Sequence, residues 1–187
     1  MIGNFCYHSS VKKVFWLIIM FFVMGCYYDV EPPVIKVEPK ITKNDVLLVA
    51  KEFKYMGLDV KTRVKSWELI SESSIVYKND EVHLENIEIK FYKKGKIVSV
   101  LKGDRGKLYS KKNSAEILTN VVLENYENNT KILSSRLIWD GNRRLIYNTL
   151  EDKTTIISRE AVLKGTGLRT TPEVYPLELQ NVEAVVQ

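Results

Sequence analysis

The residues that usually carry chemistry in proteins are scarce in this sequence and lie mostly at its beginning. Cys6, His8 and Cys26 leave His83 as the one histidine in the remaining chain, which has no further cysteine. A Cys/His zinc site, a Cys–His nucleophile or a Ser–His–Asp triad needs several such side chains to converge. Nothing marks a carboxylate pair, as a glycoside hydrolase requires, among the 23 acidic residues. We therefore expect no catalysis, no metal and no cofactor, and interpret His83 as a histidine on a strand surface.

Cys26 lies at the end of a predicted export signal. Two lysines precede an uncharged, mainly apolar stretch over residues 14–28, which is typical of an export signal. At its end, Val23-Met24-Gly25-Cys26 resembles the bacterial lipobox, in which the cysteine receives a diacylglycerol before cleavage. Two or more acyl chains hold a protein stably on a bilayer. Residues 1–25 are thus predicted to be either a lipoprotein signal peptide or an uncleaved signal anchor.

The following residues read as a spacer between membrane and domain. Three prolines within Glu31–Pro39 favour an extended linker, which we assign to residues 26–45. Both anchoring alternatives place residues 46–187 outside the cytoplasm, where they must fold without a disulfide because no cysteine remains.

The elements of this domain are predicted to be short strands. With 45% hydrophobic and 27% charged residues, the chain can form a folded core, and residues 41–171 contain no proline. Apolar runs are separated by polar turns at spacings too short for intervening helices, which favours an antiparallel all-β domain. The predicted turns are Lys78–Glu81, Lys93–Lys96, Gly103–Gly106, Lys111–Ser114, Glu127–Thr130, Asp140–Arg143, Glu151–Lys153 and Gly165–Gly167.

Two patterns refine this expectation. Ile87-Glu88-Ile89-Lys90-Phe91 alternates apolar and charged residues, so one face of the sheet should be dry. The frame Leu-x-Asn-(Ile/Val) occurs at Leu84, Leu118 and Leu179. Because asparagine is disfavoured within strands unless it marks a bend or bulge, its recurrence predicts the same kink in each unit. Chance similarity of short strands is the alternative.

Several short motifs, taken in their order along the chain, resemble the LptC family, the periplasmic, membrane-anchored subunits of lipopolysaccharide export. The resemblance covers residues 46–187. It rests on Trp67-Glu-Leu69, Leu84-Glu-Asn-Ile87, Phe91-Tyr92, Gly103-Asp-Arg-Gly106-Lys-Leu108, Leu118-Thr-Asn-Val121, Leu137-Ile-Trp-Asp140, Arg144-Leu-Ile-Tyr-Asn148 and Leu163-Lys-Gly165-Thr-Gly167-Leu168.

The resemblance implies an open, twisted antiparallel β-jellyroll at the periplasmic face of the inner membrane, whose interior holds the acyl chains of lipid A. The alternation and the aligned motifs together select a lipid groove. Its expected lining is Leu84, Ile87, Ile89, Phe91, Val121, Leu123, Leu137, Trp139 and Val186. The alternative is a scaffolding lipoprotein in which the same residues fill a closed sandwich core.

The resemblance also implies that both sheet edges accept strands from other proteins. At the N-terminal edge, residues 46–56 would join the permease and ATPase export complex. At the C-terminal edge an LptA-like periplasmic bridge protein is expected, and no nucleic acid is expected as a partner. The C-terminal edge residues are Leu179, Asn181, Val182 and Ala184; pairing of this last strand only within its own sheet is the alternative.

Overall fold

A computed structural model describes residues 45–59 and 62–186, with backbone alone for residues 185 and 186. Cys26 and the predicted signal and linker residues up to 44 lie outside this part. Apart from one short 3₁₀ turn, the regular elements described are strands, which confirms the all-β expectation. They are β1 (Val46–Leu58), β2 (Lys65–Tyr77), β3 (Glu81–Lys93), β4 (Lys96–Tyr109), η2 (Ser110–Lys112), β5 (Ser114–Asn125), β6 (Thr130–Asp140), β7 (Leu145–Tyr147), β8 (Thr154–Ile157), β9 (Ala161–Thr170) and β10 (Leu177–Val186).

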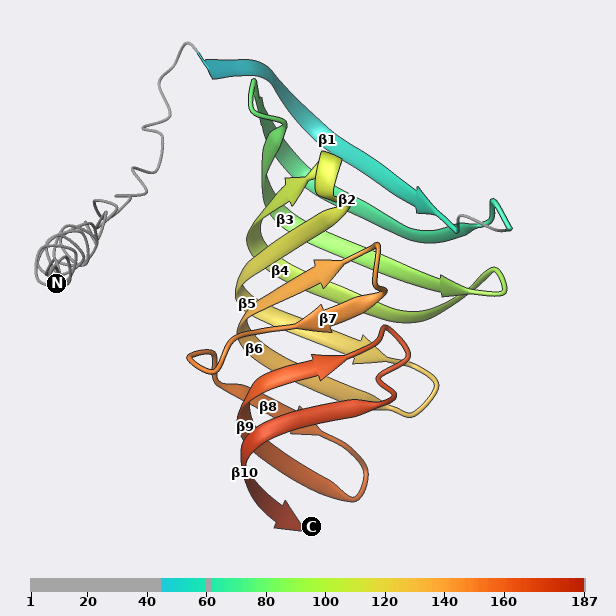
Figure 1. The fold of residues 1–187 in the computed structure, drawn as a ribbon, viewed down its shortest axis with the longest axis vertical. Helices are drawn as coiled ribbons and strands as arrows, with labels where there is room; N and C mark the ends of the chain where they lie inside the picture. Colours follow the sequence, from blue (N-terminus) through green and yellow to red (C-terminus); the bar gives the residue numbers. More distant parts are fainter. Residues whose placement is uncertain (1–44, 60–61, 187) are drawn as a thin grey trace, which may run out of the picture. The chain divides into compact units, whose positions relative to one another are not determined.

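The strands form one antiparallel sheet that follows chain order from β1 to β6 (Figure 1). β7 pairs with one end of β6, at Ile138–Asp140, and β8 pairs with the other end, at Lys131–Ser134. Both also pair with β9, so together they form one interrupted strand. β10 pairs with β9 and ends the sheet. Meander connections of this kind follow directly from the short polar turns of the sequence.

Most of the predicted turns are confirmed, but those at Gly103–Gly106 and Gly165–Gly167 are wrong, because both segments continue as strand. The glycines allow close approach of neighbouring strands. A Cβ atom on Gly103 would lie 2.4 Å from Cγ2 of Ile117, and one on Gly165 would lie 2.6 Å from the carbonyl oxygen of Gln180. These glycines therefore mark places where strands bend and pack closely.

The bends follow a line across the sheet, which we call the crease. Asn86, Asn120 and Asn181, the three asparagines of the recurring frame, have left-handed φ values of 51°, 52° and 50°. Asparagine tolerates this conformation better than most residues. Each side-chain amide donates a hydrogen bond to a side chain of the neighbouring strand; the acceptors are Glu72, Asp104 and Thr166, respectively. The predicted common kink is confirmed.

The crease divides the sheet into two halves with apolar inner faces. On β3, Val82 and Leu84 point inward before Asn86, whereas Ile87, Ile89 and Phe91 do so after it. The side-chain alternation thus changes phase at the crease, and both halves turn their apolar residues to one interior. We define half I as residues 65–71, 87–103, 121–134, 154–165 and 183–186, and half II as residues 73–85, 105–118, 136–147, 166–170 and 177–180.

Candidate functional site

The predicted groove residues are brought together, and they are buried. The eight whose side chains are described are at most 3% exposed and belong to one hydrophobic core between the halves. They are Leu84, Ile87, Ile89, Phe91, Val121, Leu123, Leu137 and Trp139. Only the backbone of Val186 is described, as the register partner of Ala161. In this conformation the side chains pack against one another along the middle of the roll.

Aromatic rings join the two halves on the side away from the crease. Trp139 of half II meets Phe91 of half I edge-on, with 4.8 Å between the ring centroids, and Trp67 at 6.3 Å. Tyr55 of β1 extends the cluster, with its ring 5.5 Å from that of Trp67. Such pairs stabilise a core beyond their area of burial, by about 0.5–1.5 kcal/mol each. Aromatic packing therefore closes the interior on the side away from the crease.

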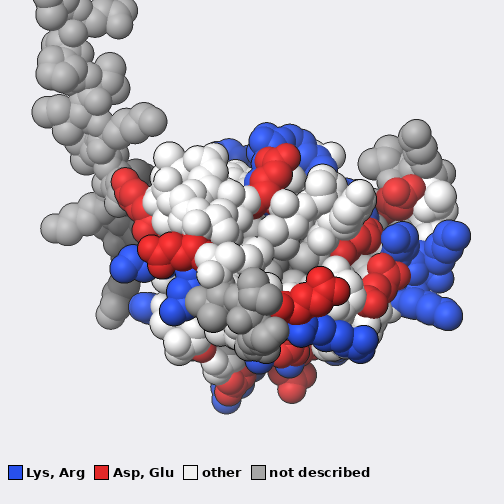
Figure 2. Space-filling view, turned by 90° about the horizontal axis from the view of Figure 1, so that it is seen from below, with Lys and Arg blue, Asp and Glu red and all other residues white. Residues whose placement is uncertain are grey.

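Burial decreases toward both ends of the sheet. β1 pairs only with β2, and β10 only with β9, within the described residues. Near β1, Phe53 is half-buried, and Leu48, opposite the core-packed Val76, is 55% exposed. Near β10, Leu179 is half-buried and Ala184 is exposed. Figure 2, viewed from the β10 end, shows uncharged residues across the middle of this face. The apolar interior is thus uncovered at two strand edges.

A third boundary of the interior is the mouth, the side away from the crease where the turn-bearing ends of the halves face each other. The β9–β10 connection, residues 171–176, crosses it and is called the strap. Nδ2 of the buried Asn125, in half I, donates to the carbonyl oxygen of Pro172 at 3.3 Å. Glu173 pairs with Arg144 of half II at 3.0 Å, and Val174 is buried in the core. The strap therefore holds the two halves together at the mouth.

Val174 adopts an unfavourable backbone conformation within this strap. Its φ is 55°, which is rare for a β-branched residue. Such residues persist only where surrounding contacts impose them, and they are concentrated at functional sites. The burial of the Val174 side chain and the bonds of its neighbours supply those contacts, so the strap is a closed but strained connection.

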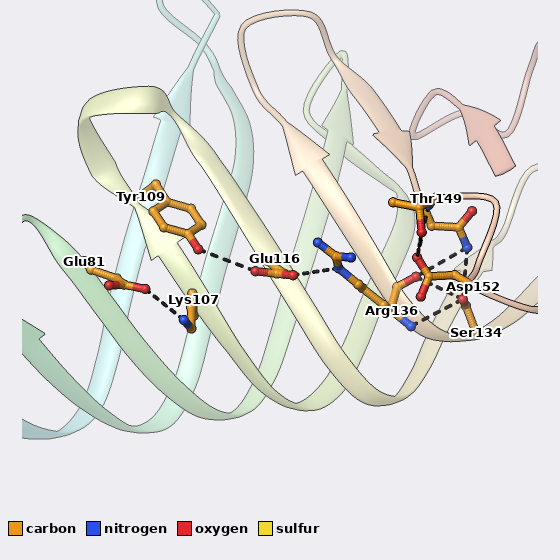
Figure 3. Close-up of polar contacts among 9 residues, drawn as sticks. Glu81, Lys107, Tyr109, Glu116, Ser134, Arg136, Thr149 and Asp152 are labelled. Atoms are coloured by element: carbon orange, nitrogen blue, oxygen red, sulfur yellow. Dashed lines mark hydrogen bonds and ion pairs between the residues drawn. The ribbon is translucent and has the colours of Figure 1, made fainter. Parts of the chain in front are cut away.

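Charged side chains occupy the outer face of half II. Figure 3 shows Glu81 beside Lys107, and Tyr109, Glu116 and Arg136 in a row across neighbouring strands. Burial alone would raise the pKa of Glu81, but hydrogen bonds from Lys107 and Asn79 and the lysine charge outweigh it and lower that pKa. Burial raises the pKa of Tyr109, with the nearby Glu116 carboxylate adding to the effect. These pairs keep the outer face polar while the inner face is apolar.

His83 lies on this same outer face, as predicted. Its ring packs on that of Tyr77 at 4.7 Å, and its Nε2 lies 3.4 Å from a carboxylate oxygen of Glu81. Among the described residues, no group of three or more His, Cys, Asp or Glu side chains is arranged to hold a metal ion.

The predicted C-terminal edge residues have distinct positions on β10. Asn181 is at the crease, and a register shift there separates two paired segments of the strand, one on each half. Leu179 packs against the core before the crease, whereas Val182, 49% exposed, and Ala184 follow it. At the other edge Leu47, Leu48 and Val49 are all more than half exposed. Both edges thus present apolar side chains beside an unpaired backbone.

Sequence reasoning missed several interior residues. Trp67 and Leu69 are buried in β2, and the motif Trp67-Glu-Leu69 already showed the necessary alternation. Ser99 is also fully buried. The residues around it, Val98–Leu101, do not alternate between apolar and polar, so the sequence does not indicate which face of the sheet its side chain is on. The strap was signalled only by Pro172 and Pro176, which favour a turn.

Together, a sheet folded along a crease, an apolar interior and two free edges define an open β-jellyroll. The resemblance seen in the sequence is confirmed: the chain belongs to the LptC family, since the family model described as lipopolysaccharide-assembly, LptC-related, matches residues 16–186. Members of this family are inner-membrane-associated periplasmic components of lipopolysaccharide export and act in transport. No match was found among curated proteins. In the part of the chain that the structure describes, no helix is both long and apolar enough to cross a membrane.

Proposed function

We propose that this domain shelters the acyl chains of lipopolysaccharide between its two halves and passes the lipid from the inner-membrane transporter to a periplasmic bridge protein. The observation that carries the proposal is a sheet that folds over a continuous apolar interior without closing into a barrel. Its two edge strands, β1 and β10, are each paired with a neighbouring strand on one side only, among the described residues. Family membership supplies the lipopolysaccharide cargo.

The energetics favour such a shelter. Burying one methylene group is worth about 0.8 kcal/mol, so moving a long acyl chain out of water is worth on the order of 10 kcal/mol. An apolar interior supplies this without covalent chemistry. Because the groove residues are packed in the present conformation, uptake requires the halves to separate at the mouth or the chain to enter at an uncovered end.

The free edges support the two proposed handover contacts. We assign β1 to the permease and ATPase complex and β10 to an LptA-like bridge protein, each through main-chain hydrogen bonds to an added strand. We also propose that residues 46–187 are the periplasmic domain and that lipidated Cys26, or an uncleaved N-terminal segment, anchors them. Incorporation of an alkynyl fatty acid into the native protein but not into Cys26→Ser would support lipidation; equal incorporation would exclude it.

Photo-crosslinking tests lipid binding directly. A photo-reactive residue at Phe91 or Leu123, on the inner face, should capture lipopolysaccharide in cells. The matched controls are Glu88 and Lys90, which alternate with the inner residues of β3 and carry the outward charges of that strand. Capture at the controls alone, or at none of the four positions, would contradict the proposal.

The full burial of the groove residues favours a second candidate, a scaffolding lipoprotein with a closed core. This alternative predicts no capture at inner positions and slow hydrogen exchange along every strand, including β1 and β10. The transport proposal predicts rapid exchange at the two edges in the isolated domain and protection there when partners bind.

A further inference from the structure

Two buried hydrogen-bond donors on the side of the interior away from the crease lack a partner. Ser99 and Trp139 are both 0% exposed, and neither Ser99 Oγ nor Trp139 Nε1 makes a hydrogen bond with any described residue. Native proteins leave few buried polar groups unpaired, so each such group calls for a reason. An aromatic residue with no acceptor for its N–H could be replaced by phenylalanine at no loss of hydrogen bonding.

Both donors lie near Phe91 and near the mouth. Ser99 is the register partner of Phe91 on β3 and of Asn125 on β5, so its side chain shares their inner face. Trp139 approaches Phe91 from the opposite half at 4.8 Å between ring centroids. Asn125 is also the residue that holds the strap. The side chains of Ser99 and Trp139 therefore lie on the side of the interior that the strap closes, away from the crease at Asp104 on β4.

Their position matches the head end of an acyl chain that enters tail first. The hydrocarbon tail offers no acceptor, whereas the ester or amide carbonyl at its head does. A chain lying with its tail toward the crease would leave that carbonyl at the mouth. We propose that Ser99 Oγ and Trp139 Nε1 donate hydrogen bonds to the carbonyl oxygens of acyl linkages, which selects acylated lipids over other hydrocarbon chains. This inference rests on the proposed function.

Lipids that differ only at the linkage provide the test. The full-length protein is used, and its equilibrium affinity is measured for two lipids in the same detergent micelles. One is dimyristoyl phosphatidylglycerol, and the other is its diether analogue with tetradecyl chains. We expect the ester lipid to bind about fivefold more tightly than the ether lipid. In Ser99→Ala and Trp139→Phe the ratio should fall to about twofold, and in the double variant to one.

Ser74→Ala is the matched control. Ser74 is also buried with an unpartnered hydroxyl, but it pairs with Leu84 beside the crease, away from the mouth. Its removal should leave the fivefold ratio unchanged. Ser99→Ala should keep the thermal midpoint of the native protein, because its hydroxyl has no bond to lose, so this variant remains informative if Trp139→Phe folds poorly.

The outcomes separate the two proposals. Equal affinity for ester and ether lipids in the native protein, or a ratio that survives in both variants, overturns the assignment of the donors while leaving lipid binding intact. A ratio lowered as much by Ser74→Ala as by Ser99→Ala also overturns it. Binding of neither lipid overturns the donor assignment, whereas the proposed function is judged separately by the capture of lipopolysaccharide at Phe91 and Leu123.

Discussion

The ring of Trp139 stands edge-on to the ring of Phe91 across the interior, at a tilt of 66°. The two residues come from opposite halves of the folded sheet, so this contact joins what the crease brings face to face. Their strands are not neighbours in the sheet. The packing of these rings thus depends on the fold of the whole sheet and joins the two halves near the mouth.

Phe91→Ala should therefore destabilise the domain by about 3–5 kcal/mol, because it removes a fully buried ring and leaves a cavity. Chemical denaturation monitored by circular dichroism measures this change. Lys90→Ala, at the adjacent outward position, should cost less than about 1 kcal/mol. Similar losses for the two variants would show that the interior contact is not the main source of stability.

The strap should control opening at the mouth. Asn125→Ala removes the bond to Pro172 and two turn bonds from the amides of Glu127 and Asn128, and we expect a loss of about 1–2 kcal/mol with faster hydrogen exchange over residues 171–176. Asn128→Ala, which loses only a bond within the same turn, serves as the control. Unchanged exchange in the strap of Asn125→Ala would remove its proposed closing role.

The crease can be tested by comparing two substitutions at one residue. Asn120→Gly and Asn120→Ala both lose the bond to Asp104, but only glycine adopts a φ of 52° without strain. We expect alanine to be less stable than glycine by about 1 kcal/mol. Equal midpoints of urea unfolding would mean that the left-handed conformation is not needed for the bend.

Stability should depend on the protonation of Glu81. Because the folded state lowers the pKa of Glu81 below its ordinary 4.5, its carboxylate favours folding above that pH, and this contribution is lost as the pH falls through the lowered value. Glu81→Gln should therefore reduce the thermal midpoint at pH 6 more than at pH 3. Lys107→Met, which removes the main compensating charge, should weaken the same dependence. A Glu81→Gln effect of equal size at both pH values would argue against this assignment.

The C-terminal edge is open to a direct binding test. Val182 lies at the crease bulge and makes no register pair with β9, so Val182→Pro should leave the monomer folded but weaken association with an LptA-like partner at least tenfold. A charged residue at Val186, which pairs with Ala161, should also weaken this association. Leu47→Pro at the opposite edge is the control for pull-down measurements. If the β10 variants bind the partner as well as the native protein does, β10 is not the partner site.

Much of the fold can be predicted from the sequence because it depends on the conformational preferences of neighbouring residues. Alternation in Ile87–Phe91 fixed which face of β3 is dry, and polar turn residues fixed most hairpins. The recurring asparagines gave the crease, since few other residues accept a left-handed conformation within a strand. The glycines at 103 and 165 were misread as turns because the same residue type serves both a turn and a close strand approach.

What the sequence could not decide is how the two dry faces meet. The alternation of apolar residues is the same in a closed core and in an open trough. The burial of Leu123 and Trp139 therefore depends on the packing of the two halves against each other. The strap from Pro172 to Val174, the aromatic contact across the interior and the unpaired donors of Ser99 and Trp139 arise between residues distant in the chain. Local propensity specifies strands, bends and their faces; long-range packing alone determines which of those faces remain accessible.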